Sequence, residues 1–477
     1  MIESVPPSKV VSHVSVLEKL VYGMASFVDS WPVWIPLALA SPVLTMQLGI
    51  KPWVVSLLFV SFRCWDAMTD PLMGWISDNT NSRWGRRRPY IFVGAILIGV
   101  TFPLMWFFPR DASQEWILAW MVVSGLLLYS SLGVWAMPYH SLYMELTPDY
   151  NERTRINSYR FIFAILFGLA IGWSWSLTQL DIFRDPVTGA PDTLRGTRYV
   201  TVVMGAIMVV FGVLPALFVR ERFANSEVVK QRKKSRLRDD LRLTLQNRNF
   251  LILIFVTVFF VSSTALVKSF GQFIIGYYVL EGDLVRASTF NGLTQTIYTV
   301  GVLVGIFTAD FLSPRWGKKQ VMMIALVTQL LGCLLTYFVL WPNAPYLTLI
   351  NPIFLGFGSQ ATWLLVGSMV ADIADEDELA TGTRREGSYS STYSWVVKMS
   401  FTLGFGASGP LLELTGFDVN NGADQIDVFF RMKLMMTLLP VFVLLVAIFV
   451  LRYYSLTAEN ASETRARLEA RRQKSSN

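Results

Sequence analysis

Cysteines and catalytic motifs are scarce in this sequence. Among 477 residues only Cys64 and Cys333 are cysteines, and both lie in apolar runs. Their number and spacing exclude a disulfide framework and a cysteine zinc site. The motifs GxxxxGK(S/T), GxSxG and HExxH, which mark common nucleotide and hydrolase sites, do not occur. The chain is therefore not predicted to be an enzyme.

Charged residues are also few. They make up 16% of the chain, against 53% hydrophobic residues, and the mean hydropathy is +0.44. This balance excludes a water-soluble fold of this length and predicts an all-α membrane protein. Apolar runs of about 20 residues, long enough to cross a bilayer, recur along the whole chain. We count twelve, over residues 20–46, 52–77, 90–108, 114–138, 157–178, 199–219, 250–278, 289–312, 320–341, 346–371, 389–415 and 429–453.

Basic residues predict the orientation of these spans. The first run, from Tyr22 to Met46, lacks a small-residue cleavage site and is expected to remain as a span rather than be removed as a signal peptide. Most of the 41 Lys and Arg fall in alternate connectors and in the terminal segments, which places both termini in the cytoplasm. The net charge of +7 is thus explained by the basic connectors that orient the spans in the membrane. No nucleic-acid partner is expected.

The chain divides into two similar halves. A basic connector, residues 220–249, separates residues 1–219 from residues 250–453, and a polar cytoplasmic tail follows over 454–477. The stretch from Arg83 to Arg87 after the second run returns about 230 residues later, from Arg315 to Lys319 after the eighth. A weaker echo links residues 145–155 with residues 372–385. A parallel repeat of six-helix halves, with a substrate cavity between them, is typical of the major facilitator fold.

The second run carries three ionisable residues. Arg63, Asp66 and Asp70 lie at spacings of three and four, so that they share one helical face, and Thr69 adds a hydroxyl beside them. A charge at mid-bilayer costs about 2.5–3.5 kcal/mol, which makes such residues functional candidates. Two carboxylates one turn apart favour a shared proton or a cation such as Na⁺. The alternative is that Arg63 and a lysine from another helix only neutralise them.

Other ionisable residues lie within or near the runs. Asp29, among aromatic residues, suits the hydroxyl groups of a sugar. His140 either binds substrate or is structural, and Arg160 either binds hydroxyls or a carboxylate or extends to the membrane surface. Lys398 is expected to serve as a charge partner of Asp66 when the cation is absent.

These residues together resemble one family. The resembling stretches extend nearly from end to end of the chain: Tyr22–Gly23, Trp65–Trp75, Arg83–Gly85, Pro138–Tyr139, Glu145–Thr154 and Met369–Asp375. They resemble the glycoside-pentoside-hexuronide:cation symporter family of the major facilitator superfamily. The resemblance implies a major facilitator fold with twelve transmembrane helices.

The resemblance also implies roles for single residues. Asp66 and Asp70 would hold the coupling cation, with Thr69 standing where the family has an asparagine ligand. Three further residues match positions that line the sugar and cation cavity: Arg160, Trp363 and Lys398.

Two departures from the family pattern leave the coupling ion open. The family's asparagine ligand is Thr69 here, and a threonine associated with the cation site is Gly133; a third change, Ala136 in place of an aspartate of the fourth run, affects the solute cavity. Fewer oxygen ligands weaken the case for Na⁺, a hard cation, so that H⁺ and Na⁺ are equal alternatives. No cofactor is expected.

The sequence thus predicts a symporter that couples uptake of a sugar, glycoside or sugar acid to H⁺ or Na⁺ by alternating access. It is expected to act as a monomer in the bilayer, in the bacterial inner membrane. The alternative on the same fold is a cation-coupled carrier of an amphipathic lipid or drug-like solute, which the abundant Phe and Met favour. A receptor that does not transport is disfavoured, because it would need no cation pair.

Overall fold

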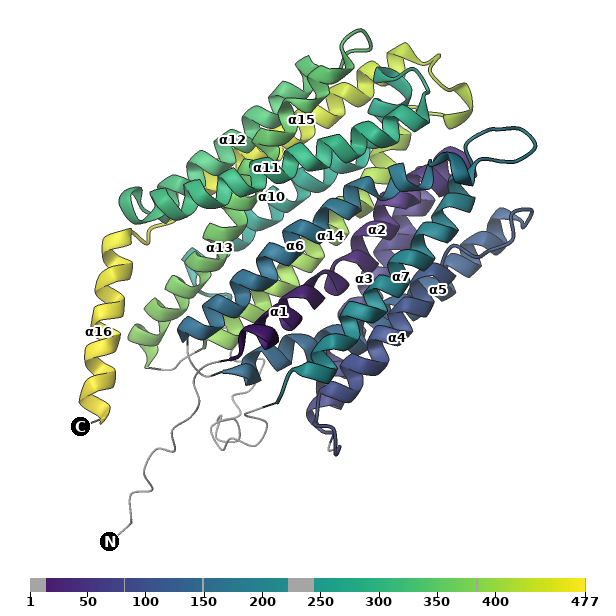
Figure 1. Ribbon diagram of the computed structural model, residues 1–477. Helices are drawn as coiled ribbons and strands as arrows, with labels where there is room; N and C mark the ends of the chain where they lie inside the picture. Colours follow the sequence, from purple (N-terminus) through teal and green to yellow (C-terminus); the bar gives the residue numbers. More distant parts are fainter. Residues whose placement is uncertain (1–13, 81, 148–149, 222–243, 383–384, 477) are drawn as a thin grey trace. The chain divides into compact units, whose positions relative to one another are not determined.

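The structure is a computed structural model that describes the chain except for residues 1–13, 81, 148–149, 222–243, 383–384 and 477. Within the described ranges every regular element is helical (Figure 1). Most of the basic connector at 220–249 lies outside the described residues. The division of the chain into halves at this connector therefore stays a prediction.

The first expected span is a helix that changes its geometry along its length. It runs through α1 (Val16–Met24), the 3-10 turn η1 (Ala25–Asp29), α2 (Trp31–Ala40) and the π-helical turn η2 (Ser41–Gln47). Pro32 has no N–H to donate to the carbonyl of Val28, so the regular helical bonding is interrupted next to Asp29. The interruption leaves Asp29 as the last residue of η1.

The remaining helices follow in chain order. The first set is α3 (Pro52–Asp78), α4 (Arg88–Leu104), α5 (Gln114–Leu146), α6 (Tyr150–Thr178), η3 (Asp181–Phe183) and α7 (Thr193–Phe218). The second set is α10 (Arg248–Phe273), η4 (Ile274–Val279), α11 (Leu284–Trp316), α12 (Lys318–Val339), η5 (Pro345–Leu349), α13 (Asn351–Thr381), α14 (Glu386–Leu414), η6 (Val419–Asn421), α15 (Ile426–Leu451) and α16 (Ala458–Ser476). The π-helical turns η2 and η4 lie about 230 residues apart, the offset of the sequence repeat.

Nine helical segments of the described chain are long and apolar enough to cross a membrane. The three other expected spans correspond to α3, α4 and α14. Of these, α4 has 17 residues, α3 carries Arg63, Asp66 and Asp70, and α14 carries Lys398. Helices such as α5 and α13 also continue about ten residues beyond the expected spans, because a helix does not have to end where its apolar run ends.

By its internal contacts the chain forms two compact units. Unit 1 comprises the described residues of Met1–Ala40 and Cys64–Arg232, and unit 2 those of Ser41–Arg63 and Lys233–Asn477. The first part of α3 belongs to unit 2 because it packs closely on α14. A Cβ atom added at Gly409 would lie 2.3 Å from Ser56 Oγ, so this approach requires glycine.

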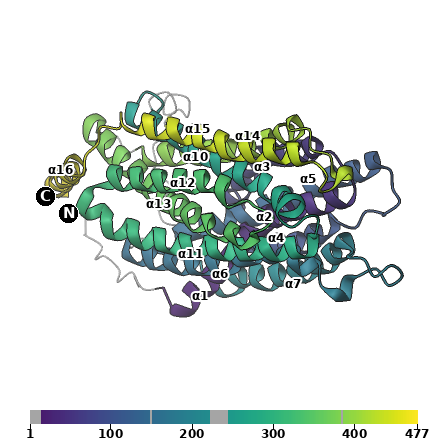
Figure 2. The same cartoon turned by 90° about the horizontal axis from the view of Figure 1, so that it is seen from above.

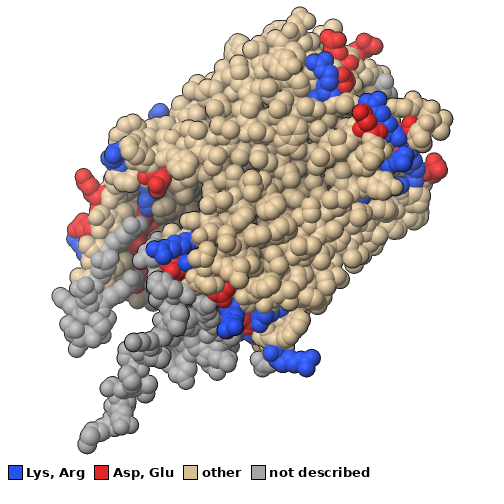
Figure 3. Space-filling view, viewed as in Figure 1, with Lys and Arg blue, Asp and Glu red and all other residues tan. Residues whose placement is uncertain are grey.

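Within each unit the long helices pack side by side. In unit 1, α4 lies against α5 and α7, and in unit 2, α15 lies against α10 and α12 (Figures 1 and 2). The polar helix α16 packs on α13. On the face shown in Figure 3, Lys, Arg, Asp and Glu gather near the helix ends and leave a broad uncharged surface, as expected for a lipid-facing protein.

Candidate functional site

The expected cation residues lie on one continuous helix, α3. Asp66 is 4% exposed, and Asp70 follows it by one turn. The Thr69 hydroxyl donates to the Trp65 carbonyl at 3.1 Å. Because that bond uses the hydroxyl proton, the lone pairs of Thr69 Oγ1 remain able to accept a proton or to bind a cation. Pro71 lies inside the helix and has no N–H to donate to the Ala67 carbonyl. This carbonyl is therefore a further oxygen near the same turn, beside the two carboxylates and the Thr69 hydroxyl.

Helix α5 passes beside this turn of α3. Trp65 Nε1 donates to Ser130 Oγ at 2.8 Å, which fixes the two helices at this level. One turn further along both helices, Gly133 faces Thr69 and Asp70. A Cβ atom at Gly133 would lie 3.6 Å from Asp70 Oδ1 and 3.7 Å from Thr69 Oγ1. A Cβ atom at position 133 would therefore be in van der Waals contact with the carboxylate and the hydroxyl without a clash.

A second acid lies in a different part of unit 1. Asp29, at the end of η1, places Oδ2 3.2 Å from His140 Nε2 on α5. Both side chains are more than one third exposed. Trp31, two residues after Asp29, donates from Nε1 to the Phe167 carbonyl of α6 at 3.0 Å and so fixes the interrupted segment.

Arg160 lies among three tyrosine rings near this pair. Its Cζ atom is 5.5 to 5.8 Å from the ring centroids of Tyr22, Tyr139 and Tyr143. Tyr22 and Tyr139 stack at 4.4 Å, and each donates its hydroxyl to the backbone carbonyl of the other. The guanidinium thus lies against aromatic faces, which attract its charge.

Unit 2 contributes an aromatic cluster and two lysines. Trp363 of α13 stacks on Phe401 of α14 with ring centroids 6.2 Å apart, and it meets Phe260 of α10 edge to face at 5.4 Å. Lys398 lies on α14 one turn before Phe401. Lys268 Nζ lies 5.2 Å from the Tyr298 ring centroid. An aromatic face beside polar groups is the usual lining of a site for a ring-shaped solute.

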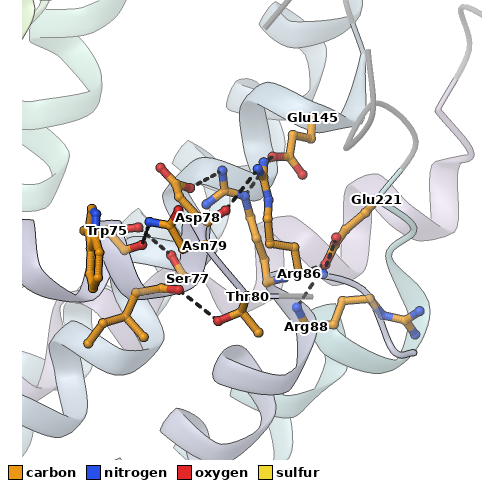
Figure 4. A network of polar contacts seen from close by, with 12 residues as sticks. Trp75, Ser77, Asp78, Asn79, Thr80, Arg86, Arg88, Glu145 and Glu221 are labelled. Carbon is orange, nitrogen blue, oxygen red and sulfur yellow. Dashed lines mark hydrogen bonds and ion pairs between the residues drawn. The ribbon is translucent and has the colours of Figure 1, made fainter. Parts of the chain in front are cut away.

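The basic stretch after α3 braces the ends of several helices in unit 1. Arg86 Nη2 and Arg87 Nε reach Glu145 Oε1 of α5 at 2.5 and 2.8 Å, and Arg87 Nη2 lies 2.9 Å from Asp78 Oδ1 (Figure 4). Glu145 and Arg87 are buried, and a buried charge needs such partners. These contacts indicate that the basic stretch holds the helix ends together, and they favour this role over phosphate binding.

Glu221, just after α7, caps the start of α4. Its carboxylate accepts the backbone N–H groups of Arg86, Arg87 and Arg88 at 2.8, 2.8 and 3.0 Å (Figure 4). An acid is stabilising at a helix N-terminus, where N–H groups lack helical partners. Gly85 precedes them with φ +104°, and a Cβ atom there would lie 2.7 Å from Glu221 Oε1. Both the backbone and the space therefore require glycine.

The repeated stretch in unit 2 makes a related set of contacts. Gly317 also has a positive φ, +84°. Lys318 Nζ lies 2.5 Å from Asp372 Oδ2 of α13, and Lys319 Nζ donates to the carbonyls of Arg452 and Tyr454 at 2.8 and 2.6 Å. The echo seen in the sequence thus corresponds, in each unit, to a basic side chain paired with a carboxylate of another helix.

The predicted site residues are spread over both units. Unit 1 holds Asp29 in contact with His140, Arg160 among the tyrosines, and Asp66, Thr69 and Asp70 on one turn of α3. Unit 2 holds the other predicted residues: Arg63, Trp363 and Lys398. The sequence reasoning missed the tyrosines around Arg160. Tyr139 and Tyr143 are four residues apart, and that spacing could have shown that they share a helical face.

Comparison with known proteins gives one family that covers most of the chain. The family described as MFS/sugar transport protein matches residues 35–458. The putative glycoside/cation symporter YagG of Escherichia coli (strain K12) is 23% identical, with 94% of this chain and 93% of that protein covered. The isoprimeverose transporter of Lactiplantibacillus pentosus is 26% identical, over 78% of this chain and 75% of that protein.

Two further similarities concern a different solute and the fold. The sodium-dependent lysophosphatidylcholine symporter 1 of Gallus gallus is 24% identical, over 89% of this chain and 84% of that protein. A crystal structure of the nucleoside transporter NupG aligns with a TM-score of 0.65 at 16% identity, covering 90% of this chain and 99% of that one. At this identity the structural likeness shows a shared all-helical fold and nothing about the solute.

Proposed function

Because the chain belongs to the MFS/sugar transport protein family, it is a multi-pass membrane transporter rather than an enzyme, and we propose that it is a cation-coupled sugar symporter. It couples the uptake of a sugar, glycoside or sugar acid to H⁺ or Na⁺ by alternating access. Two relatives with sugar-related names, one a glycoside/cation symporter and one an isoprimeverose transporter, support this solute class.

The proposed topology has twelve spans in two six-helix halves, residues 1–219 and 250–453, with both termini in the cytoplasm. Nine apolar helices support it directly. We add α3, α4 and α14 to them, because the charges in α3 and α14 are those that a transporter places inside the membrane for its own chemistry.

One observation carries the coupling role: Asp66 and Asp70 lie one turn apart on α3, with Asp66 buried. Two carboxylates at this spacing repel each other, and a proton or Na⁺ bound between them removes the repulsion. Thr69 Oγ1 and the Ala67 carbonyl supply further oxygen atoms on the same turn. The bound cation would lower the cost of these charges and so stabilise the form that binds solute.

The solute residues are proposed on chemical grounds. Trp363, stacked on Phe401, offers an apolar face to a sugar ring. Asp29, His140, Arg160 and Lys398 offer hydrogen-bond donors and acceptors to hydroxyl or carboxylate groups. Each group stands on a helix, which positions it more firmly than a loop would.

An amphipathic lipid is the second candidate solute. The lysophosphatidylcholine symporter is about as similar to this chain as the sugar-related relatives are. Beyond Trp363 and Phe401, the aromatic cluster continues to Phe405. The ring centroids of Phe401 and Phe405 lie 5.9 Å apart in a stacked arrangement. Such an apolar surface would suit an acyl chain as well as a sugar ring.

Uptake into proteoliposomes tests the proposal. The purified protein is given an inward Na⁺ gradient or an inward H⁺ gradient, and a panel of neutral sugars, glycosides, sugar acids and lysophosphatidylcholine is supplied outside. We expect a sugar or glycoside to accumulate above its outside concentration with one of the two gradients. Accumulation of lysophosphatidylcholine alone would replace the sugar proposal with the lipid one, and no accumulation under either gradient would refute cation-coupled uptake.

A further inference from the structure

Asp29 and His140 meet across two elements of unit 1, η1 and α5. Their Oδ2 and Nε2 atoms are 3.2 Å apart, and their side chains are 37% and 38% exposed. Phe27, Val28 and Tyr139, their neighbours along the chain, are fully buried. The pair is therefore anchored in packed protein and open on one side. A carboxylate facing lipid is costly, so the open side is expected to face water.

Another ion pair of unit 1 provides a contrast. Lys19 Nζ and Glu152 Oε2 lie 2.6 Å apart, and their side chains are only 8% and 2% exposed. Water has little access to that pair, which suits a permanent bridge between α1 and α6. The Asp29–His140 pair differs from it in two ways. Water can reach the pair, and one of its partners is an imidazole, a group that gains and loses a proton near neutral pH.

The other ionisable groups around the pair are not suited to exchange a proton. They come from α1, α5 and α6, and they are Tyr22, Tyr139, Tyr143 and Arg160. The three tyrosine hydroxyls all donate to backbone carbonyls. Arg160 keeps its charge at all physiological pH values. Helix α2, and α7 from residue 200 to residue 218, contain no ionisable residue.

Two protonation states of the pair follow from this arrangement. In the neutral imidazole, Nε2–H donates to Asp29 and Nδ1 is bare. A proton from water then binds Nδ1 and converts the side chain to imidazolium, and the reverse step returns that proton to water. In the first state the charges of Asp29 and Arg160 balance; in the second the cluster carries one additional positive charge.

The geometry points to Asp29 and His140 as a proton-binding site made of different residues from the Asp66–Asp70 pair. Its proton sets the net charge of the cluster formed by Asp29, His140 and Arg160. A transporter with such a site responds to pH even when the coupling ion at α3 is Na⁺. The inference depends on the pair alone and does not require the coupling role of the α3 carboxylates.

Nitrogen-15 NMR of the histidine side chains tests this site directly. The chain has two histidines, His13 and His140, so a His13→Gln variant leaves His140 as the single imidazole. The full-length variant in lipid nanodiscs is titrated from about pH 5 to about pH 8, the range in which imidazoles exchange protons. We expect Nε2 to stay protonated throughout and Nδ1 to change from protonated to bare as the pH rises. A Nδ1 signal that does not change over this range would overturn the proposal, and this measurement needs no change at the site.

Two variants in the same background test the partner and the separation. Asp29→Asn removes the acceptor charge, and we expect the fixed tautomer to become a mixture in which Nε2 is bare in part of the molecules. Asp66→Asn is expected to leave the His140 signals as they were. An unchanged tautomer in the first variant, or the same mixing in the second, would contradict a separate site built on Asp29.

Discussion

The two units differ in the acids and bases within their expected spans. Unit 1 has the acids Asp29, Asp66 and Asp70 as well as Arg160, whereas unit 2 has the bases Arg63, Lys268 and Lys398. Both arrangements are costly in a bilayer, so neither is expected without a use. We propose that the difference reflects separate roles, with cation binding in unit 1 and aromatic faces and positive charge in unit 2.

The units differ in a second respect, at the repeated basic stretches Arg83–Arg87 and Arg315–Lys319. In unit 1 the basic residues bond to three carboxylates, those of Asp78, Glu145 and Glu221. Among the described residues of unit 2, the corresponding lysines bond to the carboxylate of Asp372 and to the backbone carbonyls of Ser368, Arg452 and Tyr454. The same sequence pattern therefore makes a more strongly charged brace in the first unit.

Removing an acid from α3 should have the largest effect. Asp66→Asn or Asp70→Asn eliminates a proposed cation ligand, and we expect gradient-driven accumulation in proteoliposomes to fall by about a hundredfold. Asp181→Asn is the matched control, because Asp181 is 88% exposed in a short turn between α6 and α7. Near-normal accumulation in either α3 variant would remove the proposed distinction between the units.

The glycines of the two braces give a paired test of stability. Gly85→Ala would strain a positive φ and displace Glu221 from its three N–H donors, whereas Gly317→Ala would only strain the backbone, because the nearest atom is 3.7 Å away. We expect losses of about 2 kcal/mol for Gly85→Ala and about 1 kcal/mol for Gly317→Ala, measured as thermal unfolding of the purified variants. Equal losses would show that the contact with Glu221 adds nothing to stability.

Trp363 tests the aromatic side of unit 2. Trp363→Ala removes the face stacked on Phe401, and we expect solute affinity to fall about tenfold, while Trp363→Phe, which keeps an aromatic face, should lose less. Binding is measured with the solute identified in the uptake panel. If both variants bound that solute as the unsubstituted protein does, the solute would not contact this cluster.

The smallest expected effect concerns the choice of ion. Gly133→Thr adds a hydroxyl next to Asp70 and Thr69, where a Cβ atom makes no clash, and so offers an oxygen ligand that favours Na⁺. We expect Na⁺ affinity to rise by about threefold relative to Gly133→Ala, which adds bulk without an oxygen. Sodium-dependent thermal stabilisation of the two variants measures the difference, and identical responses would mean that position 133 does not reach the ion.

The family, the helical fold and the transporter class could all be predicted from the sequence, and the comparisons confirm them. The relation between Asp66 and Asp70 was also predictable, because it depends only on helical spacing and α3 is a continuous helix. The individual roles of these residues stay predictions.

The contacts between distant segments could not be predicted. Asp29 and His140 were both recognised as candidates, yet their contact depends on where the first span is interrupted and on how η1 packs on α5. Glu221 adjoins a basic connector, and nothing local indicates that it caps α4. Such pairings are set by tertiary packing between helices far apart in sequence.

Reciprocal binding tests the central claim, cation coupling at Asp66 and Asp70, most directly. The factor by which the cation tightens solute binding is measured, and so is the factor by which the solute tightens cation binding. The account predicts that the two factors are equal and that both fall to about one in Asp66→Asn. An undiminished factor in Asp66→Asn would contradict it, because the coupling ion would then bind elsewhere.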